Sequence, residues 1–521
     1  MKSSDSSTHQ GTLPTRWGHP QGLFYLFFAE LWERFSFYGM RALLTLYMTK
    51  HLLYSDEMSI GIYATYGSLV YMTPLIGGIV AEKLIGYRKA IILGGILMAI
   101  GHFLLAVEHP IFFYGALAII IVGNGFFKPN ISSLVGALYE KEDVRRDAGF
   151  TIFYLGINIG GMVAPLLCAY LAESYGWHYG FALAGLGMLL GLVFFYRGMF
   201  KNVFGEHGKV PNPTKYAQKI IGIDKGKWIA ILSFLSVPFV ALIVKFHEFE
   251  HYLVWAVSLG VFLVLLKIYV SVPNVEKSRL LVIVYFTILA TLFWAIFEQA
   301  GSSLTLFADR NVNLVGFNAS QTNSFNSAFI ILMAIPFSLL WPFLTKRNCN
   351  PSSAVKFGIG LILLGLGYLV FAASANQMDS LARTPMFYLI LGYLVLTIGE
   401  MFLSPIGLSK MTELSPSKFV AFIMGVWFLS NFYGYFFAGK IAILTASTNG
   451  APNMLSGGIL EKISNQITGM SAANTSMLGA SFQQLYAYVS VYATFGIIAI
   501  GVGVFALLIS PIIKRMMREV E

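Results

Sequence analysis

Charged side chains are scarce in this sequence, and their scarcity excludes an ordinary water-soluble protein. Only 12% of the 521 residues are Asp, Glu, Lys or Arg, against about 25% in a typical soluble domain. Hydrophobic residues make up 56% of the chain, and the mean hydropathy is +0.69. The composition therefore indicates a membrane protein that crosses the bilayer many times.

The excess of Lys and Arg does not indicate nucleic-acid binding. The net charge is +10, but the basic residues lie in short loops between apolar stretches. Nucleic-acid-binding proteins instead gather Lys and Arg on one soluble face. We therefore expect the lipid bilayer, and no nucleic acid, as a partner.

Cysteine is almost absent, which excludes a disulfide framework. Cys168 lies within an apolar stretch and Cys349 lies in a basic loop. The phosphate-binding pattern G-x-x-x-x-G-K-[ST] is also missing, which disfavours transport driven by ATP. The first twenty residues are polar and lack the apolar core of a secretory signal, so we expect a disordered tail there.

Long apolar runs are abundant, and fourteen of them are long enough to cross a bilayer as helices. A polar stretch and two further spans separate a first set of six from a second set of six. The predicted spans are 22–50, 59–80, 90–107, 111–137, 148–173, 178–198, 228–246, 251–271, 281–307, 320–344, 353–374, 385–411, 417–446 and 484–512.

The spans predict an all-α polytopic membrane protein built from two six-helix halves. The predicted parts are a cytoplasmic tail at 1–21, an N-terminal six-helix bundle at 22–198, a linker with two inserted helices at 199–280, a C-terminal six-helix bundle at 281–512 and a cytoplasmic tail at 513–521.

Loop charges predict the orientation, because short loops rich in Lys and Arg stay in the cytoplasm. One side of the bundle carries Lys83, Arg88, Lys89, Lys141, Arg145, Arg146, Lys346, Arg347, Lys410, Lys418, Lys514, Arg515 and Arg518. The other side has only Lys50, Arg310, Arg383 and Lys462 in its loops. We therefore predict a multi-pass protein of the cytoplasmic (inner) membrane with both termini in the cytoplasm. The loop 447–483, rich in Gly, Ser and Asn, is expected to be a mobile segment on the outer side.

Four charges interrupt the first predicted span, in the stretch "ELWERFSFYGMR". A charge at the bilayer centre costs about 2.5–3.5 kcal/mol, so these side chains are expected to avoid lipid. At helical spacing they fall with Tyr38 within an arc of about 140°. One face of this helix is therefore predicted to be polar, and its charges are Glu30, Glu33, Arg34 and Arg41.

Three isolated charges interrupt other spans: Lys128, Glu298 and Glu400. All seven of these charges then belong to the first and fourth helices of the two halves. Matching positions of this kind are typical of transporters that consist of two repeated halves around a central cavity and work by alternating access. The seven side chains are three cations and four carboxylates, a set that suits a zwitterionic ligand better than a simple anion or cation. Two extended residues span at most about 7 Å, so a short peptide could bridge the cavity with its two charged ends. A leftover carboxylate could take a proton. Each charge could alternatively serve only in an ion pair between helices.

Several motifs resemble those of the proton-dependent oligopeptide transporter (POT) family of the major facilitator superfamily. "ELWERFSFYG" (30–39) is similar to its E-x-x-E-R-F-x-Y-Y signature, "GNGFFKPNIS" (123–132) to its lysine motif and "FTIFYLGINIGG" (150–161) to its F-Y-x-x-I-N-x-G-S signature. The likeness continues through "GGIVAEKLIG", "FEQAGSSL", "FNSAFI" and "GEMFLSPIGLSKMTELSP". The resemblance implies a major facilitator fold of the bacterial fourteen-helix type.

The resemblance also implies the function: a symporter, not an enzyme, that imports di- and tripeptides with protons by alternating access. It would need no cofactor beyond the proton gradient and would work as a monomer. Its implied proton-coupling residues are Glu30, Glu33, Arg34 and Glu298. Its implied peptide-binding residues are Arg34, Tyr38, Tyr71, Lys128, Asn158, Trp294, Asn326, Glu400 and Trp427. Its implied gates are Arg41 with Glu298 on the outer side and Lys128 with Glu400 on the inner side.

Three residues depart from the family pattern. Phe37 stands where the signature has its first tyrosine, which puts substrate range or affinity in question. Gly161 replaces the serine of the third motif, and Glu82 replaces an aspartate in "GGIVAEKLIG".

Other functions remain open from the sequence. "HEFEH" (247–251) matches the H-x-x-E-H pattern of inverted zinc proteases, but it falls at the predicted turn between the inserted helices, where we expect it to be solvated. Within transporters, the alternatives are a drug exporter and a family member that carries nitrate or another small solute. For the aromatic and Asn residues of the implied site, packing between helices is the alternative.

Overall fold

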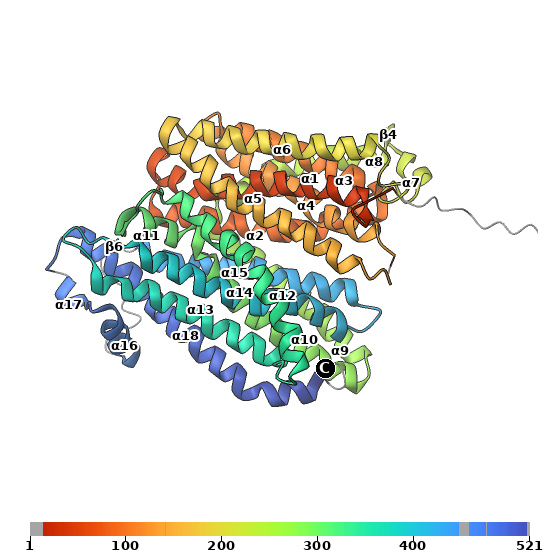
Figure 1. Ribbon diagram of the computed structural model, residues 1–521. Coiled ribbons are helices and arrows are strands. Elements are labelled where there is room, and N and C mark those ends of the chain that lie inside the picture. The colour runs from red at the N-terminus through yellow and green to blue at the C-terminus, as the bar shows by residue number, and fades with distance from the viewer. Residues whose placement is uncertain (1–13, 141, 447–457, 476, 518–521) are drawn as a thin grey trace, which may run out of the picture.

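The computed structural model describes residues 14–140, 142–446, 458–475 and 477–517. These form an elongated bundle of long helices running roughly side by side (Figure 1). The prediction of an all-α polytopic membrane protein is confirmed. The first long helix begins and the last one ends at the same end of the bundle, called here the tail end. Helices α16 (Ile459–Thr468) and α17 (Ala472–Thr475) mark the opposite end, called the loop end (Figure 1).

Six long helices form the N-terminal half, at the positions predicted. They are α1 (Gln21–Leu46), α2 (Asp56–Val80), α3 (Tyr87–Leu105), α4 (Pro110–Ala137), α5 (Arg146–Tyr175) and α6 (Trp177–Phe200). Two of them end in π-helical turns, Tyr47–His51 after α1 and Ala81–Ile85 after α2. The Ser55 hydroxyl accepts a hydrogen bond from the Met58 amide, which caps the start of α2.

Two further helices form the inserted hairpin, α8 (Lys225–Lys245) and α9 (Glu250–Ser271). Before them lie the short helix α7 (Pro213–Ala217) and the paired strands β3 (Lys219–Ile220) and β4 (Ile223–Asp224). Helix α8 packs on α4 and α2, and the apolar side of α9 packs on α2 and on α15 (Val420–Ala446) of the C-terminal half. Most side chains of the hairpin remain exposed, as expected of helices facing lipid.

The C-terminal half contains α10 (Asn274–Phe297), α11 (Ser303–Asn311), α12 (Ser324–Lys346), α13 (Ser353–Ala373), α14 (Met386–Leu414), α15 (Val420–Ala446) and α18 (Ala480–Met517). The predicted span over 281–307 lies within a candidate membrane span at Asn274–Asn311, but its helix is interrupted. A 3-10 turn at Glu298–Gly301 separates α10 from α11. The turn is stabilised because the Gln299 amide donates to the carbonyl of Ala438 on α15, at 2.9 Å.

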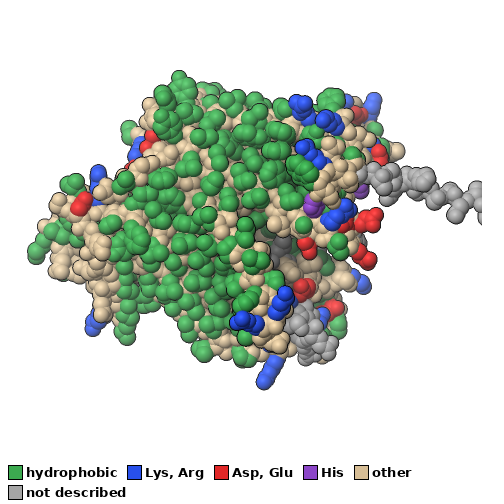
Figure 2. All heavy atoms as spheres, viewed as in Figure 1, with side chains coloured by type: hydrophobic (Ala, Val, Ile, Leu, Met, Phe, Trp, Pro, Cys, Tyr) green, Lys and Arg blue, Asp and Glu red, His purple; other side chains and the backbone are tan. Residues whose placement is uncertain are grey.

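The count of fourteen spans stays a prediction. Within the described residues, twelve helices are long and apolar enough to cross a membrane. The other two predicted spans coincide with α1, which carries the four charges, and α15. Figure 2 shows hydrophobic side chains over the middle of the bundle, with charged ones gathered towards its ends, as a bilayer requires.

Two loop expectations are corrected. Residues 14–20 are not a disordered tail: β1 (Thr15–Arg16) pairs with β2 (His19–Pro20), and Arg145 donates to the Gly18 carbonyl at 2.8 Å. The loop expected to be mobile contains α16 (Ile459–Thr468), packed on α18 and α13, and α17 (Ala472–Thr475). Residues 1–13, 447–457 and 518–521, and with them the charge of Arg518, lie outside the described residues, as does Lys141. The predicted domain boundaries stay predictions.

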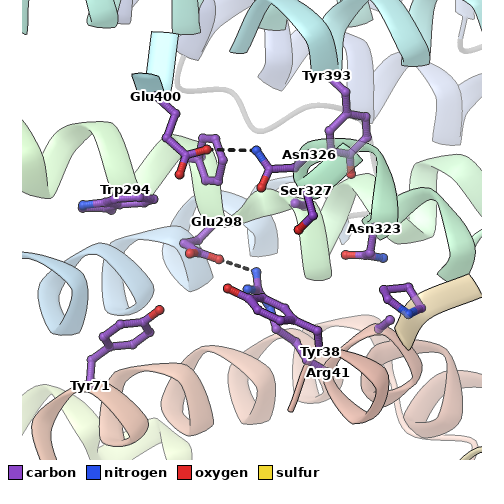
Figure 3. A pocket seen from close by; sticks show the side chains of 14 residues that line it. Tyr38, Arg41, Tyr71, Trp294, Glu298, Asn323, Asn326, Ser327, Tyr393 and Glu400 are labelled. Carbon is purple, nitrogen blue, oxygen red and sulfur yellow. Dashed lines mark hydrogen bonds and ion pairs between the residues drawn. The ribbon is translucent and has the colours of Figure 1, made fainter. Parts of the chain in front are cut away.

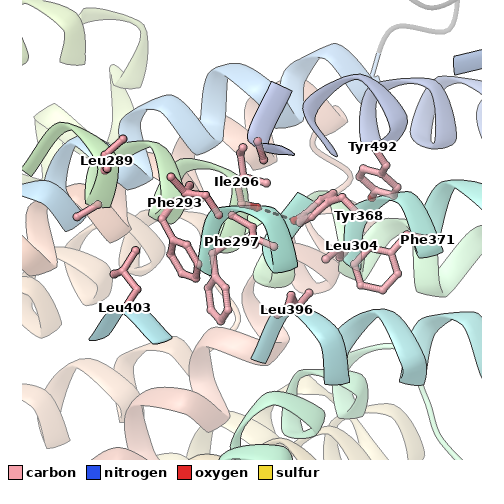
Figure 4. Packing of buried hydrophobic residues seen from close by; sticks show 14 of the residues in the cluster. Leu289, Phe293, Ile296, Phe297, Leu304, Tyr368, Phe371, Leu396, Leu403 and Tyr492 are labelled. Atoms are coloured by element: carbon pink, nitrogen blue, oxygen red, sulfur yellow. Dashed lines mark hydrogen bonds between the residues drawn. The ribbon is translucent and has the colours of Figure 1, made fainter. Parts of the chain in front are cut away.

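The largest hydrophobic core fills the C-terminal half (Figure 4). Phe293 stacks on Phe297, and the Tyr368 hydroxyl donates to the Ile296 carbonyl at 2.5 Å. This packing holds the last turns of α10 against α13 and so fixes the position of the turn that begins at Glu298. A short parallel pair, β5 (Val312–Asn313) with β6 (Thr384–Pro385), ties the end of α11 to the start of α14.

Candidate functional site

A cavity of about 100 Å³ lies between the two halves (Figure 3). The N-terminal half lines it with Tyr38, Arg41, Ala42, Tyr71 and Pro165. The C-terminal half lines it with Trp294, Phe297, Glu298, Ala300, Asn323, Asn326, Ser327, Tyr393 and Glu400. Ligand pockets commonly measure about 300–1,000 Å³, so a dipeptide would require this cavity to widen.

An ion pair crosses the cavity from one half to the other. Arg41 of α1 donates to the carboxylate of Glu298, at the end of α10 (Figure 3). The Arg41 Nε atom also donates to the Tyr63 hydroxyl at 2.6 Å. The rings of Tyr38, Tyr63 and Tyr435 lie 5.7–5.9 Å from the guanidinium carbon, within range of cation–π attraction. Removing one partner of such a buried pair costs about 3–5 kcal/mol.

The break between α10 and α11 places Glu298 at the cavity. The Thr45 hydroxyl of α1 donates to the Gly301 carbonyl at 2.6 Å, which fixes the turn against the N-terminal half. Gly301 has no side chain, so the Tyr63 hydroxyl can lie directly against it. The sequence places Glu298 inside a helix, but the structure places it where the helix ends.

A second carboxylate faces the cavity from the C-terminal half. Glu400 of α14 is 9% exposed and accepts a hydrogen bond from Asn326 of α12 at 2.9 Å (Figure 3). The same amide lies 3.1 Å from the Thr397 hydroxyl oxygen. Asn326 therefore holds the carboxylate in a defined position without neutralising it.

A cluster of charges lies beside the cavity on α1. Arg34 donates to both oxygens of Glu33, and its Nε atom lies 3.4 Å from Glu30. All three side chains are at most 2% exposed. Glu30 Oε2 has no hydrogen-bond partner within the described part of the chain. Two carboxylates thus share one guanidinium, and a proton or a further cation would relieve the excess negative charge.

Lys128 of α4 borders the cavity. Its ammonium lies 4.2 Å from the centre of the Tyr71 ring, which lines the cavity. No ion pair joins Lys128 to Glu400 among the described residues, so the predicted inner gate is not closed in this structure.

Of the predicted site residues, Tyr38, Arg41, Tyr71, Trp294, Glu298, Asn326 and Glu400 line the cavity. The others lie elsewhere. Asn158 donates to the Tyr154 carbonyl on its own helix at 3.0 Å. Trp427 is 6% exposed and packs against Phe357 in the C-terminal core, which favours a packing role.

Sequence reasoning missed Tyr63, Tyr435, Tyr393, Asn323 and Ser327. With 27 Tyr in the chain, no pattern distinguishes the tyrosines around Arg41 from those that pack in the core. Ser327 had a signal, because it follows Asn326 within the family-like motif "FNSAFI". Phe37 lies beside the site rather than in it: it is 2% exposed, and the Arg34 guanidinium carbon lies 5.0 Å from its ring centre.

Gly161 lies directly opposite Ser327. A Cβ atom at Gly161 would lie 2.6 Å from Ser327 Oγ and 3.2 Å from the Tyr38 ring. The serine of the family-like motif is thus absent from α5, and α12 supplies a hydroxyl in the same space. A side chain at position 161 would therefore require Ser327 Oγ to move.

We expect Gly161→Ser to destabilise the protein by about 1–3 kcal/mol, because it overpacks this contact. Thermal unfolding of the detergent-purified protein measures the change. Ser327→Ala should restore stability in the double variant while having little effect alone. Equal loss in the single and double variants would show that Ser327 does not limit the space.

Two more ion pairs join the halves near the loop end. Lys50 pairs with Asp309 at 2.5 Å, and Arg310 holds both oxygens of Asp56 at 2.5 and 2.8 Å. Asp309 and Arg310 both belong to α11. With the Arg41–Glu298 pair, these contacts hold the halves together between the cavity and the loop end.

The "HEFEH" turn does not form a metal site: within the described residues, no group of three His, Cys, Asp or Glu side chains could hold a metal ion. His247–Phe249 is a 3-10 turn, and Glu250 begins α9. The expectation of a solvated turn is wrong for Glu250, which is 5% exposed and packs against α2.

Comparison with known proteins agrees with this geometry. A model of the POT family matches residues 88–458. The chain is 37% identical to the "Uncharacterized transporter YclF" of Bacillus subtilis (strain 168), over the full length of both, and 33% identical to the "Di-/tripeptide transporter" of Lactococcus lactis subsp. cremoris, over 98% of this chain and 99% of that protein. Among solved structures, the chain is similar to a mutant of the peptide transporter POT in complex with alafosfalin. The TM-score is 0.79 and the sequence identity is 32%, over 97% of this chain and 98% of that chain.

Proposed function

Because the chain belongs to the POT family and is a peptide transporter with a major facilitator fold, we propose that it imports di- and tripeptides together with protons. It is a transporter and not an enzyme. We further propose that the proton gradient is its only energy source, that it needs no cofactor and that it works as a monomer.

One observation carries the proposal: cationic and acidic side chains reach the cavity from different halves. Arg41 lines it and Lys128 borders it, over the ring of Tyr71, on the N-terminal side, whereas Glu298 and Glu400 face it from the C-terminal half. A peptide with a free carboxylate and a free ammonium matches that arrangement. We assign the carboxylate to Arg34 and Lys128 and the ammonium to Glu400 and Asn326. A small anion such as nitrate would leave the Glu400 carboxylate without an ammonium to bind.

The proton would act at carboxylates that are held by buried cations. Protonating Glu298 removes the charge that binds Arg41, so the halves can separate towards the loop end. Protonating Glu33 frees Arg34 to bind the peptide carboxylate. Binding and release on opposite sides then follow from alternating access, in which one half rocks against the other.

We place the loop end outside the cell and both termini in the cytoplasm of a bacterial inner membrane. The basic loops at the tail end support this orientation, because positive loops stay cytoplasmic. With three ion pairs near the loop end, the structure then corresponds to a state closed to the outside.

Proteoliposomes with an inward proton gradient test the function. They should accumulate radiolabelled di-alanine, and an ionophore that collapses the gradient should abolish accumulation. Uptake that persists without the gradient would refute proton coupling, and accumulation of nitrate but no peptide would refute the substrate.

We expect Asp56→Asn to shift the protein towards a state open at the loop end. The bidentate pair with Arg310 is partly exposed, and the loss of about 1 kcal/mol corresponds to a population shift of about fivefold. Spin labels on cysteines at Glu57 and Asn313, in a Cys349→Ser background, would report the distance between the halves. An unchanged distance distribution in Asp56→Asn would contradict the prediction.

A further inference from the structure

A second cavity, of about 530 Å³, lies near the loop end and shares no lining residue with the first. Three elements enclose it: the first turns of α2, the turn of the inserted hairpin and the last part of α15. We call it the hairpin cleft. It is lined by Ser55, Glu57, Met58, Gly61, Ala64, Lys245, His247, Glu248, Glu250, Phe436, Gly439, Lys440 and Ile443.

Small residues bring the elements of the hairpin cleft close together. A Cβ on Gly439 of α15 would lie 2.5 Å from that of Ala64 on α2. The His247 ring lies directly against Gly61, in the space that a side chain there would need. The hairpin is therefore docked on α2 where α2 meets α15, and the cleft spans both halves of the protein.

Glu250 is a buried carboxylate of the hairpin cleft with an incomplete set of partners. Its Oε2 atom accepts a hydrogen bond from the Thr65 hydroxyl at 2.7 Å. Its Oε1 atom is buried and has no hydrogen-bond partner among the described residues, and the same is true of the neighbouring Ser68 hydroxyl. An unsatisfied buried carboxylate oxygen is costly, so Oε1 requires a donor, either the Ser68 hydroxyl or a group bound in the cleft.

Lys440 supplies the opposite charge. It lies in α15 and lines the same cleft as Glu250 and His247. Its ammonium lies 5.3 Å from the Phe436 ring, and no ion pair joins it to an acid within the described residues. Within the part of the chain that the structure describes, the cleft thus offers a carboxylate with one oxygen not hydrogen-bonded and an ammonium that forms no ion pair.

The surroundings of the hairpin cleft indicate membrane depth. The cleft lies where three spans end, and Tyr252 and Trp255 on the next turns of α9 are 64% and 72% exposed. Exposed Tyr and Trp mark the boundary between acyl chains and headgroups. Beyond them α8 and α9 expose apolar side chains along their length, such as Leu235, Phe239 and Leu259.

We propose that the hairpin cleft binds the headgroup of a phospholipid that carries a primary ammonium next to its phosphate. The ammonium donates to Glu250 Oε1, the phosphate pairs with Lys440, and the acyl chains lie along α8 and α9. A primary ammonium has protons to donate, whereas the quaternary ammonium of a choline headgroup has none. The cleft therefore distinguishes ethanolamine from choline lipids.

Binding of spin-labelled lipids to the full-length protein in nanodiscs tests this proposal. One charge-assisted hydrogen bond predicts that phosphatidylethanolamine associates about tenfold more strongly than phosphatidylcholine with the same acyl chains. Glu250→Gln should abolish the difference between the two lipids. Lys440→Met should weaken both lipids. Glu276→Gln and Lys267→Met change the same residue types outside the cleft. Both variants should keep the preference of the wild type for phosphatidylethanolamine.

Two competition experiments distinguish a lipid headgroup from a soluble ligand with the same charged groups. Glycerophosphoethanolamine and di-alanine at millimolar concentration should not displace the labelled lipid. Displacement by either would show a site for a soluble zwitterion and overturn the lipid assignment. Equal binding of the two lipids to the wild type, or a preference that survives in both cleft variants, would also overturn it. If Glu250→Gln does not fold, the comparison of the two lipids on the wild-type protein tests the preference for the primary ammonium, and Lys440→Met tests the phosphate contact.

Discussion

Glu33→Gln is expected to abolish proton-driven accumulation of peptide while leaving exchange of peptide across the membrane. Glu33 holds Arg34 through both carboxylate oxygens in a site at most 2% exposed. A glutamine keeps the shape and one hydrogen-bond acceptor, but it can no longer gain or lose a proton. The variant should therefore bind and exchange peptide with no link to the gradient.

Two assays on the same proteoliposomes measure this. Uptake of labelled di-alanine driven by an inward proton gradient should fall to the level of empty liposomes, and counterflow into liposomes loaded with unlabelled di-alanine should persist. Loss of both activities would indicate a defect in folding or binding. Because Arg34 keeps Glu30 at 3.4 Å, the loss of stability should stay below the about 3–5 kcal/mol typical of a broken buried pair.

Lys128→Ala is expected to raise the KM for di-alanine by about a hundredfold. Truncating one member of a buried charged pair costs about 2–5 kcal/mol, and 2.7 kcal/mol corresponds to about a hundredfold. The Lys128 ammonium sits over the Tyr71 ring at the edge of the cavity, where we assign the peptide carboxylate. Uptake at low peptide concentration should fall by the same factor.

A substrate without a carboxylate is the matched control for Lys128. Di-alanine amide should be a poor competitor of di-alanine uptake in the wild type, because it offers nothing to Lys128. In Lys128→Ala the amide and the free peptide should compete about equally. Full active uptake of di-alanine by the variant, or an undiminished preference for the free carboxylate, would remove Lys128 from the binding site.

The polar face of α1 was predictable because helical spacing alone determines it. Glu30, Glu33, Arg34 and Arg41 are placed on one side of a helix by their positions in the sequence, and the structure buries the first three of them together. The need to keep charges away from lipid then predicts that this face meets protein. No knowledge of partners is required for that step.

Which partner each charge meets was predictable only through the family resemblance. The Arg41–Glu298 pair joins residues 257 positions apart, and no local pattern encodes such a contact. The turn at Glu298–Gly301 depends on Gln299 reaching the Ala438 carbonyl on α15, again a tertiary contact. Trp427 was assigned to the cavity by resemblance, yet the structure packs it beside Phe357.

The turn of the inserted hairpin contains a residue that was predicted to be exposed and is buried. Glu250 lies within a charged turn, and a run of polar residues between two spans predicts solvent exposure. Burial of Glu250 results from the close fit of His247 against Gly61 and from the Thr65 hydroxyl, neither of which periodicity can reveal.

The two ion pairs of α11 also affect how the loop end can open. Helix α11 is nine residues long and carries both Asp309 and Arg310, the partners of Lys50 and Asp56. The β5–β6 pair ties the end of α11 to α14, so α11 belongs to the C-terminal half and is expected to move with it. Any movement that carries α11 away from α1 and α2 then withdraws both charges from the N-terminal half at the same time. The two pairs are therefore expected to break together when the halves separate and not one after the other.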